Sequence, residues 1–289
     1  LRKVSAGGEG DIADLRMVEG HRRLGDLGLR LGDPALAREN YEKVERIARA
    51  LAAAHPKERE RRREIASALI KLGDLDKHLG RRADAARRYD EARIIRAEFA
   101  AKGERSALID FAQVLVRLGD VTDPDVSFGM YKSALGVREI IAASSPNDPR
   151  IGRDLRVSIS KMASWHINAR RYEEARALAV KASEMAESLY RAHPTIPLFE
   201  TERGTTMSDL GKALRLSGRE EEAIRAFERA ALLLERPAAG NPNDLPLQLS
   251  RAMALVRAHR YEEALKFAEV VRKGAAKDPP ILYDCGCIY

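Results

Sequence analysis

Six short turns, each between two stretches of helical periodicity, recur along the 289-residue chain. The first residues of successive turns are 48, 39, 51, 48 and 41 residues apart, an average of about 45. A period in this range is typical of stacked helix pairs, in which each unit buries its apolar face against its neighbours. The turns are Gly32-Asp33, Gly80-Arg81, Gly119-Asp120, Arg170-Arg171, Gly218-Arg219 and His259-Arg260.

The residues after each turn repeat a pattern of small and aromatic side chains. Small residues or rings follow at steps of five, four and three, which puts them on one helix face and lets a second helix approach closely. The third copy fits through Ser127, Tyr131 and Ala134 if Asp123-Pro124 belongs to a three-residue insertion in its turn. The other five copies have Ala37, Ala85, Ala175, Ala223 and Ala264, then Tyr41, Tyr89, Ala179, Phe227 and Ala268, then Val44, Ala92, Ala182, Ala230 and Val271.

The stretch before each turn places glycine beside leucine, as in Leu72-Gly73 and Leu210-Gly211. Glycine inside a helix costs about 1 kcal/mol relative to alanine, so its recurrence predicts a contact that has no room for a side chain. Most of the second stretches end at proline or glycine, because proline cannot continue a helix. These residues are Pro56, Gly103, Pro146, Pro194, Pro237 and Pro279. No alternating stretch is long enough to predict a sheet.

With these motifs the chain resembles the tetratricopeptide repeat (TPR) family. Leu-Gly in the first helix, a Gly-rich turn and Tyr-Glu-Glu-Ala, at Tyr172 to Ala175 and Tyr261 to Ala264, carry the resemblance. The usual unit has about 34 residues, so this chain resembles a long-unit variant whose second helices are extended. The resemblance implies an all-α, right-handed solenoid of about six antiparallel helix pairs over residues 11–279. We expect a flexible N-terminal segment at 1–10 and the start of a further helix at 280–289.

A narrower resemblance concerns Leu-Gly-Asp-Leu-Gly at 24–28, Asp-Pro-Ala-Leu-Ala-Arg at 33–38 and the last eight residues. These segments are similar to the repeat arrays that follow serine/threonine kinase domains in some bacteria, notably planctomycetes. The chain itself has no Gly-rich phosphate loop, no His-Arg-Asp loop and no Asp-Phe-Gly motif. The similarity therefore concerns only the appendage of such a kinase.

Composition and spacing argue against several classes of function. Lys and Arg number 51 against 44 Asp and Glu, a mild net charge of +7, and the few aromatic residues weaken a single-strand nucleic-acid interpretation. No apolar run approaches the roughly 20 residues of a membrane helix. No histidine pair has zinc-site spacing, Cys285 and Cys287 would not face each other on a helix, and no nucleophile constellation is present. We therefore predict no enzyme activity, no cofactor, no metal and no membrane partner.

The remaining candidate site is the inner groove lined by the first helices. Counting back from each turn gives a face that mixes cations, amides and aliphatics, which suits an extended or helical peptide, acidic ones in particular. The alternative is a solvated inner surface without a ligand. The candidate residues are Arg22, Asp26, Arg30, Asp74, Lys77, Gln113, Arg117, Ser160, Ser164, Asn168, Lys212, Arg215 and Arg257. Some TPR proteins hold a terminal carboxylate with Lys and Asn pairs, and Asp26 and Asp74 stand where those Asn residues would be, which argues against that mode in the first two copies.

The sequence thus predicts a non-catalytic, cytoplasmic protein–protein interaction scaffold that binds a partner peptide or helix in the groove. One alternative is a regulatory or substrate-recruiting region C-terminal to a bacterial serine/threonine kinase domain. A second is a nucleic-acid-binding solenoid, which would lose affinity steeply with salt. Because an array needs polar end caps, we also expect self-association through the open C-terminal unit.

Overall fold

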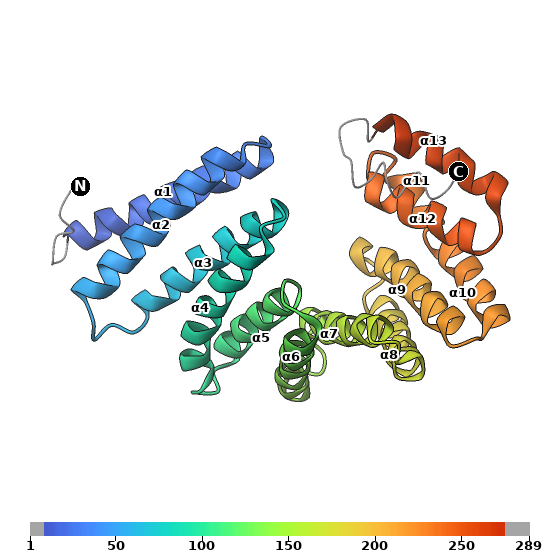
Figure 1. Cartoon of the computed structure of the whole chain (residues 1–289), viewed down its shortest axis with the longest axis horizontal. Coiled ribbons are helices and arrows are strands. Elements are labelled where there is room, and N and C mark those ends of the chain that lie inside the picture. The colour runs from blue at the N-terminus through green and yellow to red at the C-terminus, as the bar shows by residue number, and fades with distance from the viewer. Residues whose placement is uncertain (1–8, 275–289) are drawn as a thin grey trace. The chain divides into compact units, whose positions relative to one another are not determined.

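The computed structural model describes the backbone of residues 9–274, and every regular element in that range is an α-helix (Figure 1). Twelve of these helices form consecutive pairs, and a short helix, α11 (Glu235–Gly240), directly follows α10. The pairs are α1 (Glu9–Arg30) with α2 (Pro34–Ala54), α3 (Arg61–His78) with α4 (Arg82–Ala100), α5 (Arg105–Gly119) with α6 (Pro124–Ser144), α7 (Pro149–Asn168) with α8 (Tyr172–Ala192), α9 (Pro197–Leu216) with α10 (Glu220–Leu233), and α12 (Leu245–Arg257) with α13 (Tyr261–Gly274). The predicted all-α architecture of six helix pairs is confirmed.

The chain divides into two compact units, Leu1–Ile141 and Ala142–Tyr289. Within the first unit α2 packs on α3 and α4 packs on α5, and within the second α8 packs on α9 and α10 on α12. Within each unit, successive pairs therefore contact one another, as in other repeat arrays. Helix α1 begins at Glu9, two residues before the predicted start of the array. The rest of the predicted N-terminal segment, the predicted helix at 280–289 and the two cysteines lie outside the described residues.

Left-handed backbone conformations close most of the predicted turns. The φ angle is +70° at Gly32, +73° at Gly80 and +79° at Gly218, where glycine avoids a clash with a Cβ. Arg170 and His259 adopt φ angles of 58° and 61° at the equivalent points of their own turns. Proline stands at the first position of four helices, where its missing N–H costs nothing.

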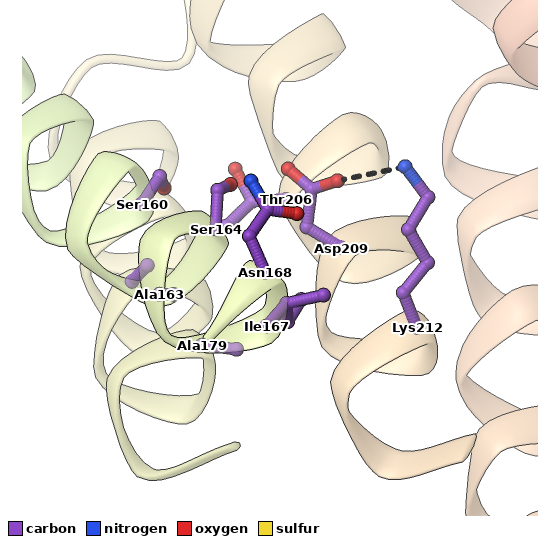
Figure 2. Close-up of a pocket in the computed structure, with 10 residues that line it drawn as sticks. Ser160, Ala163, Ser164, Ile167, Asn168, Ala179, Thr206, Asp209 and Lys212 are labelled. Atoms are coloured by element: carbon purple, nitrogen blue, oxygen red, sulfur yellow. Dashed lines mark hydrogen bonds and ion pairs between the residues drawn. The ribbon is translucent and has the colours of Figure 1, made fainter. Parts of the chain in front are cut away.

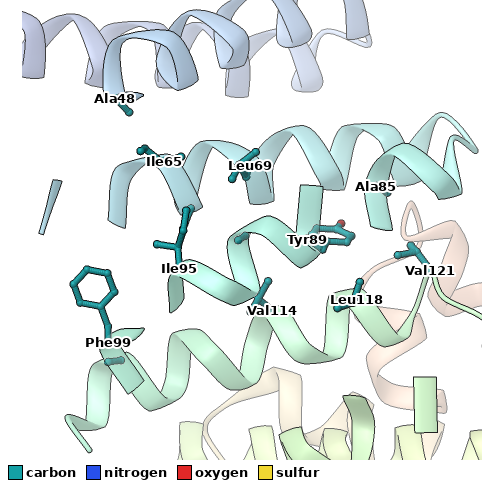
Figure 3. Packing of buried hydrophobic residues seen from close by; sticks show 13 residues of the cluster. Ala48, Ile65, Leu69, Ala85, Tyr89, Ile95, Phe99, Val114, Leu118 and Val121 are labelled. Atoms are coloured by element: carbon teal, nitrogen blue, oxygen red, sulfur yellow. The ribbon is translucent and has the colours of Figure 1, made fainter. Parts of the chain in front are cut away.

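The small residues predicted to face the neighbouring helix form the core. The alanine five residues after each turn is fully buried in all five copies that have one: Ala37, Ala85, Ala175, Ala223 and Ala264. In the third copy Ser127 and Ala134 are buried too, as predicted. Gly119, predicted to open the turn there, instead ends α5 against the Tyr131 ring, where Gly25 and Gly73 stand in the first two copies, so the predicted three-residue insertion after it is wrong. Figure 3 shows one such cluster in the first unit, where Leu69, Val114 and Leu118 pack in the same cluster as Tyr89.

The glycines of the first helices lie directly against rings of the second helices. A Cβ on Gly73 would come within 2.6 Å of the Tyr89 ring, and one on Gly211 within 2.7 Å of the Phe227 ring. Gly25 meets Tyr41 and Gly119 meets Tyr131 in the same way. The recurring Leu-Gly motif is therefore explained by a ring seated on the helix backbone, as the sequence predicted. None of the described helices combines the length and the apolar character that a membrane span requires.

Candidate functional site

The predicted groove aspartates of the first unit are bound by the chain itself. The Tyr41 hydroxyl donates to Asp26 Oδ1 over 2.6 Å, and Lys71 Nζ donates to the same oxygen over 2.8 Å. One copy later, Tyr89 donates to Asp74 over 2.6 Å. Asp74 also accepts from Arg117 Nε, on the following first helix, over 3.0 Å. Each carboxylate therefore joins its own helix pair to the next.

The third copy repeats this arrangement with one change. Tyr131 donates to Asp120 over 2.8 Å, but the cation on Asp120 is Lys77, from the preceding copy, at 2.9 Å. Burial and the hydrogen bond to aspartate raise the pKa of all three tyrosines, so their hydroxyls stay protonated donors. Burial alone would raise the pKa of Asp26, but the hydrogen bonds from Lys71 and Tyr41 outweigh it and leave that pKa lowered.

The other predicted groove residues of the first unit are less uniform. Arg22 pairs with Glu19 over 2.9 Å and also with Glu64. Arg30 is exposed and makes no ion pair within the described residues, and Gln113 is half-buried on α5. The charges that line a cavity of about 260 Å³ between α1, α2 and α3 are already paired: Arg22 with Glu64, which both line it, and Lys71 with Asp26. Most of the predicted groove charge in this unit is therefore committed to internal contacts.

The charged run at 57–64 is an ion-paired helix start. Arg61 pairs with Glu58, three residues away, over 2.9 Å, and Arg62 reaches Glu98 on α4 over 2.5 Å. Ion pairs between helices therefore add to those between residues close in the sequence. These cations are therefore only partly available to phosphates.

The second unit contains an open cavity of about 210 Å³ between α7 and α9, lined by both polar and apolar side chains (Figure 2). Helix α7 contributes Ser160, Ser164 and Asn168, whose four-residue spacing places them on one face. Helix α9 contributes Thr206, Asp209 and Lys212 at three-residue spacing, and small or aliphatic side chains complete the lining, namely Ala163, Ile167, Ala179 and Ala182. The structure therefore brings together four of the predicted groove residues, from the fourth and fifth copies.

The two sides of this cavity differ in how far their polar groups are satisfied. Ser160 Oγ is buried without a hydrogen-bond partner, and Ser164 and Asn168 are exposed with no side-chain hydrogen bond among the described residues. On the other side Thr206 donates to the Glu202 carbonyl over 2.6 Å, and Lys212 Nζ lies 3.4 Å from Asp209. Ser164 and Asn168, which are exposed and unpaired within the described residues, can therefore exchange their water hydrogen bonds for bonds to a ligand.

The two arginines predicted beside this cavity do not line it. Arg215 pairs with Glu220 over 2.8 Å and donates to the carbonyl of Arg257 over 2.8 Å. Both guanidinium groups lie over the Phe227 ring, at 4.9 Å and 5.7 Å from its centre. Burial lowers the pKa of Arg257, the neighbouring positive charge of Arg215 adds to this, and Asp209 opposes it. Both arginines therefore contact the Phe227 ring of the fifth copy, and Arg215 also joins that copy to the backbone of α12.

The cavity exists because the fourth copy departs from the tyrosine pattern. Ala179 stands where Tyr41 and Tyr89 stand in the first two copies, so no ring fills the space. In the first helix of each of the first five copies, the residue under the ring (a glycine, or Ala163 in the fourth copy) is the packing position, and the residue after it changes as well. That next residue is aspartate in the copies with a tyrosine ring, Ser164 in the copy with Ala179, and Lys212 in the copy with Phe227. The aspartate is present only in copies whose ring has a hydroxyl to donate. This covariation is visible in the sequence, but the groove prediction did not use it.

Comparison with known families supports the architecture. Residues 156–195, which span most of α7 and all of α8, match the family model described as tetratricopeptide repeat. The chain is thus a TPR-like helical repeat protein, and one matched repeat forms the α7 side of the cavity. A search of curated proteins gave no match.

Solved structures share this fold at low sequence identity. The apo form of the quorum sensor NprR from B. thuringiensis aligns with a TM-score of 0.57 and 15% identity, over 98% of this chain and 70% of that chain. The apo form of RapI aligns with a TM-score of 0.56 and 12% identity, over 94% of each chain. BtubC (BKLC) from P. vanneervenii aligns with a TM-score of 0.54 and 17% identity, over 83% of this chain and 89% of that chain. Identities at this level establish the fold alone.

Proposed function

We propose that this chain is a non-catalytic interaction module that binds an extended segment of a protein partner in the α7–α9 cavity. The observation that carries the proposal is the contrast between the two units. The predicted groove aspartates of the first unit are bound internally, whereas Ser160, Ser164 and Asn168 have no side-chain partners within the described residues. Exposed side chains that donate and accept hydrogen bonds, as Ser164 and Asn168 do, can hold the backbone of an extended peptide.

The spacing of these side chains suits an extended chain. Four residues along a helix rise about 6.0 Å, and an extended peptide presents backbone groups on one side every 6.6–6.8 Å or so. A segment lying along α7 therefore offers successive amides and carbonyls to Ser160, Ser164 and Asn168. Lys212 is the cation on the opposite wall. Its Nζ makes a long contact of 3.4 Å with Asp209, so it favours an acidic residue in the bound segment.

Charge pairing favours a protein partner over a nucleic acid. Arg22, Lys71, Lys77 and Arg117 of the first unit are each within 3 Å of a carboxylate oxygen. Salt-dependent phosphate binding needs cations that can exchange small counterions for phosphates, and paired side chains do this poorly. A region that recruits substrates to a neighbouring kinase domain would use the same cavity. Identifying the bound partner distinguishes this role from that of a general scaffold.

A graft of the closed geometry of the first unit tests this proposal. The variant Ala163→Gly, Ser164→Asp, Ala179→Tyr recreates the glycine, aspartate and tyrosine of the first two copies and fills the cavity. A peptide selected from a displayed library on the full chain would be titrated into both proteins by calorimetry. We expect at least a ten-fold loss of affinity in the graft.

A milder pair of variants controls for folding. Ser164→Ala with Asn168→Ala removes two hydrogen-bonding groups from the α7 wall and should weaken the peptide about ten-fold, because each neutral hydrogen bond contributes roughly 0.5–1.5 kcal/mol. Asn243→Ala, an exposed residue outside the cavity, should have no effect. If all variants bind the selected peptide equally, the cavity is not the binding site.

A further inference from the structure

Helix α1 carries an apolar stripe that faces away from its own partner helix. Met17, Leu24 and Leu27 are between 42% and 45% exposed, and with Gly20 they follow the three- and four-residue spacing of one helix face. Gly20 has open space where a Cβ would stand. The face of α1 that packs on α2 is a different one, marked by the buried Val18, Gly25 and Gly28. We call Met17, Gly20, Leu24 and Leu27 the α1 stripe.

The same stripe is buried in the next first helix. Residues 48 positions further on, the offset that separates Gly25 from Gly73, are Ile65, Ala68, Leu72 and Leu75 of α3. All four are at most 7% exposed. What covers them is the preceding second helix, α2: Leu72 and Leu75 cluster with Ala37 and Tyr41, Ala68 with Val44, and Ile65 with Ala48. The α1 stripe is therefore the stacking surface of a repeat, without a second helix on it in the described residues.

A cation beside the stripe points to the same kind of partner. Arg23 corresponds to Lys71 of α3 and Arg117 of α5. Those two residues bind aspartates of the preceding first helix, Asp26 and Asp74, at 2.8 Å and 3.0 Å. Arg23 pairs only with Glu19 of its own helix among the described residues, and its side chain is 78% exposed. Arg23 can thus bind a carboxylate from the first helix of a docked pair.

We propose that the α1 stripe is a docking surface for a helix pair of a partner protein, of the same kind as the pairs in this chain. The partner's second helix places a small–aromatic–small face, like Ala37, Tyr41 and Val44, on Met17, Leu24 and Leu27. Its first helix supplies an aspartate to Arg23. This surface is separate from the α7–α9 cavity, so it adds a second partner class to the proposed function.

In the first two helix pairs of this chain the corresponding faces are already occupied. The α2 face is covered by α3, and the α4 face, with Ala85, Tyr89 and Ala92, lies in one cluster with Val114 and Leu118 of α5. A second copy of the chain therefore has neither of these faces free. The occupant is a partner protein whose second helix is exposed. It is recognised by the fit of that helix to the α1 stripe and by the positive charge of Arg23.

The probe for this surface is a fluorescent peptide with the sequence of residues 9–60, containing α1, α2 and their connection to α3. It carries Leu24→Glu so that its own stripe cannot accept another probe molecule. Unlabelled full chain is titrated into a trace of probe, and fluorescence anisotropy is recorded. We expect saturable binding, weakened at least ten-fold by Leu24→Glu in the chain. Leu232→Glu on α10, an exposed leucine elsewhere, should leave binding unchanged.

A charge exchange tests the role of Arg23. Arg23→Glu in the chain should weaken the probe about ten-fold. A probe with Asp26→Lys and Tyr41→Phe, which copies the Lys212 and Phe227 combination of the fifth copy, should restore binding to the Arg23→Glu chain. The proposal is overturned if the probe does not bind at 100 µM or so, if Leu24→Glu and Leu232→Glu weaken it equally, or if the chain pairs with itself through the stripe instead.

Discussion

A single hydroxyl determines which residue follows the packing position of each first helix. In three copies a tyrosine donates to an aspartate over 2.6–2.8 Å, and where the ring is Phe227 the aspartate is replaced by Lys212. An aspartate beside a buried ring without a donor would lose part of its hydration without compensation. The groove residues Asp26 and Asp74 were therefore correctly placed on the first helices by the sequence, but their side chains serve the stacking of repeats.

Removing one of these hydroxyls should reduce stability. Tyr89→Phe leaves Asp74 with Arg117 alone, and we expect a loss of about 1 kcal/mol, at the low end for a bond to a charged group because water can reach Asp74. Urea denaturation followed by circular dichroism measures it. The opposite change, Phe227→Tyr, should give no gain, because no aspartate is present to accept the hydroxyl. A gain there equal to the loss at Tyr89 would refute the pairing argument.

The buried imidazole of His166 gives the second unit a pH dependence. Burial lowers the pKa of His166, and nearby Arg171 adds to this while Glu174 opposes it. The unfolded chain then binds the proton more readily than the folded chain. The contribution to stability is therefore complete above the unfolded pKa of about 6.5 and is lost as the pH falls below it. Urea midpoints of the wild type should drop between pH 7.5 and 5.5 by more than those of His166→Gln, and equal drops would contradict this.

At the scale of the helix, the sequence specified most of the architecture because packing constraints recur at each repeat. The same residue types recur at the same positions of successive copies, so each copy supports the prediction made for the others. These residues are the buried alanines, the glycines under rings and the helix-ending prolines. The short α11 was missed because Pro237 indicates the end of one helix but is equally at home in the first turn of another. The α7–α9 cavity was missed as a cavity because it depends on one residue, Ala179, that departs from the repeat.

Two glycines with the same helical context should respond oppositely to alanine. In Gly73→Ala the new methyl would lie 2.6 Å from the Tyr89 ring, so we expect a loss of roughly 1–3 kcal/mol despite the better helix former. In Gly20→Ala the methyl meets open space, and we expect a gain of about 0.5–1 kcal/mol. Thermal or urea unfolding of both variants in parallel decides the point. An equal gain in both variants would mean that helix propensity outweighs the ring contact and that the Tyr89 ring does not require a glycine beneath it.

At the scale of the whole molecule, the two compact units offer separate reporters of stability. The only tryptophan, Trp165, lies on α7 in the second unit, whereas circular dichroism reports helices of both units. In repeat arrays each unit is stabilised mainly by its nearest neighbours, so a local change need not spread along the chain. The sequence indicated a single continuous array over 11–279, because the spacing of helix, turn and helix recurs in every copy and does not mark the division into two units.

A buried ion pair in the second unit provides the test. Arg156 and Glu202 join α7 to α9 over 2.9 Å, with side chains only 7% and 11% exposed. Glu202→Ala leaves the arginine charge buried, and we expect a loss of about 3–5 kcal/mol, against less than about 0.5 kcal/mol for Arg225→Ala at the exposed Arg225–Glu221 pair. The Glu202→Ala transition should move to lower urea by Trp165 fluorescence, while Tyr89→Phe, in the first unit, should move the circular dichroism transition and leave the fluorescence midpoint nearly in place. If Tyr89→Phe shifts both signals equally, the helix pairs unfold as one cooperative body, and stability is shared along the entire array.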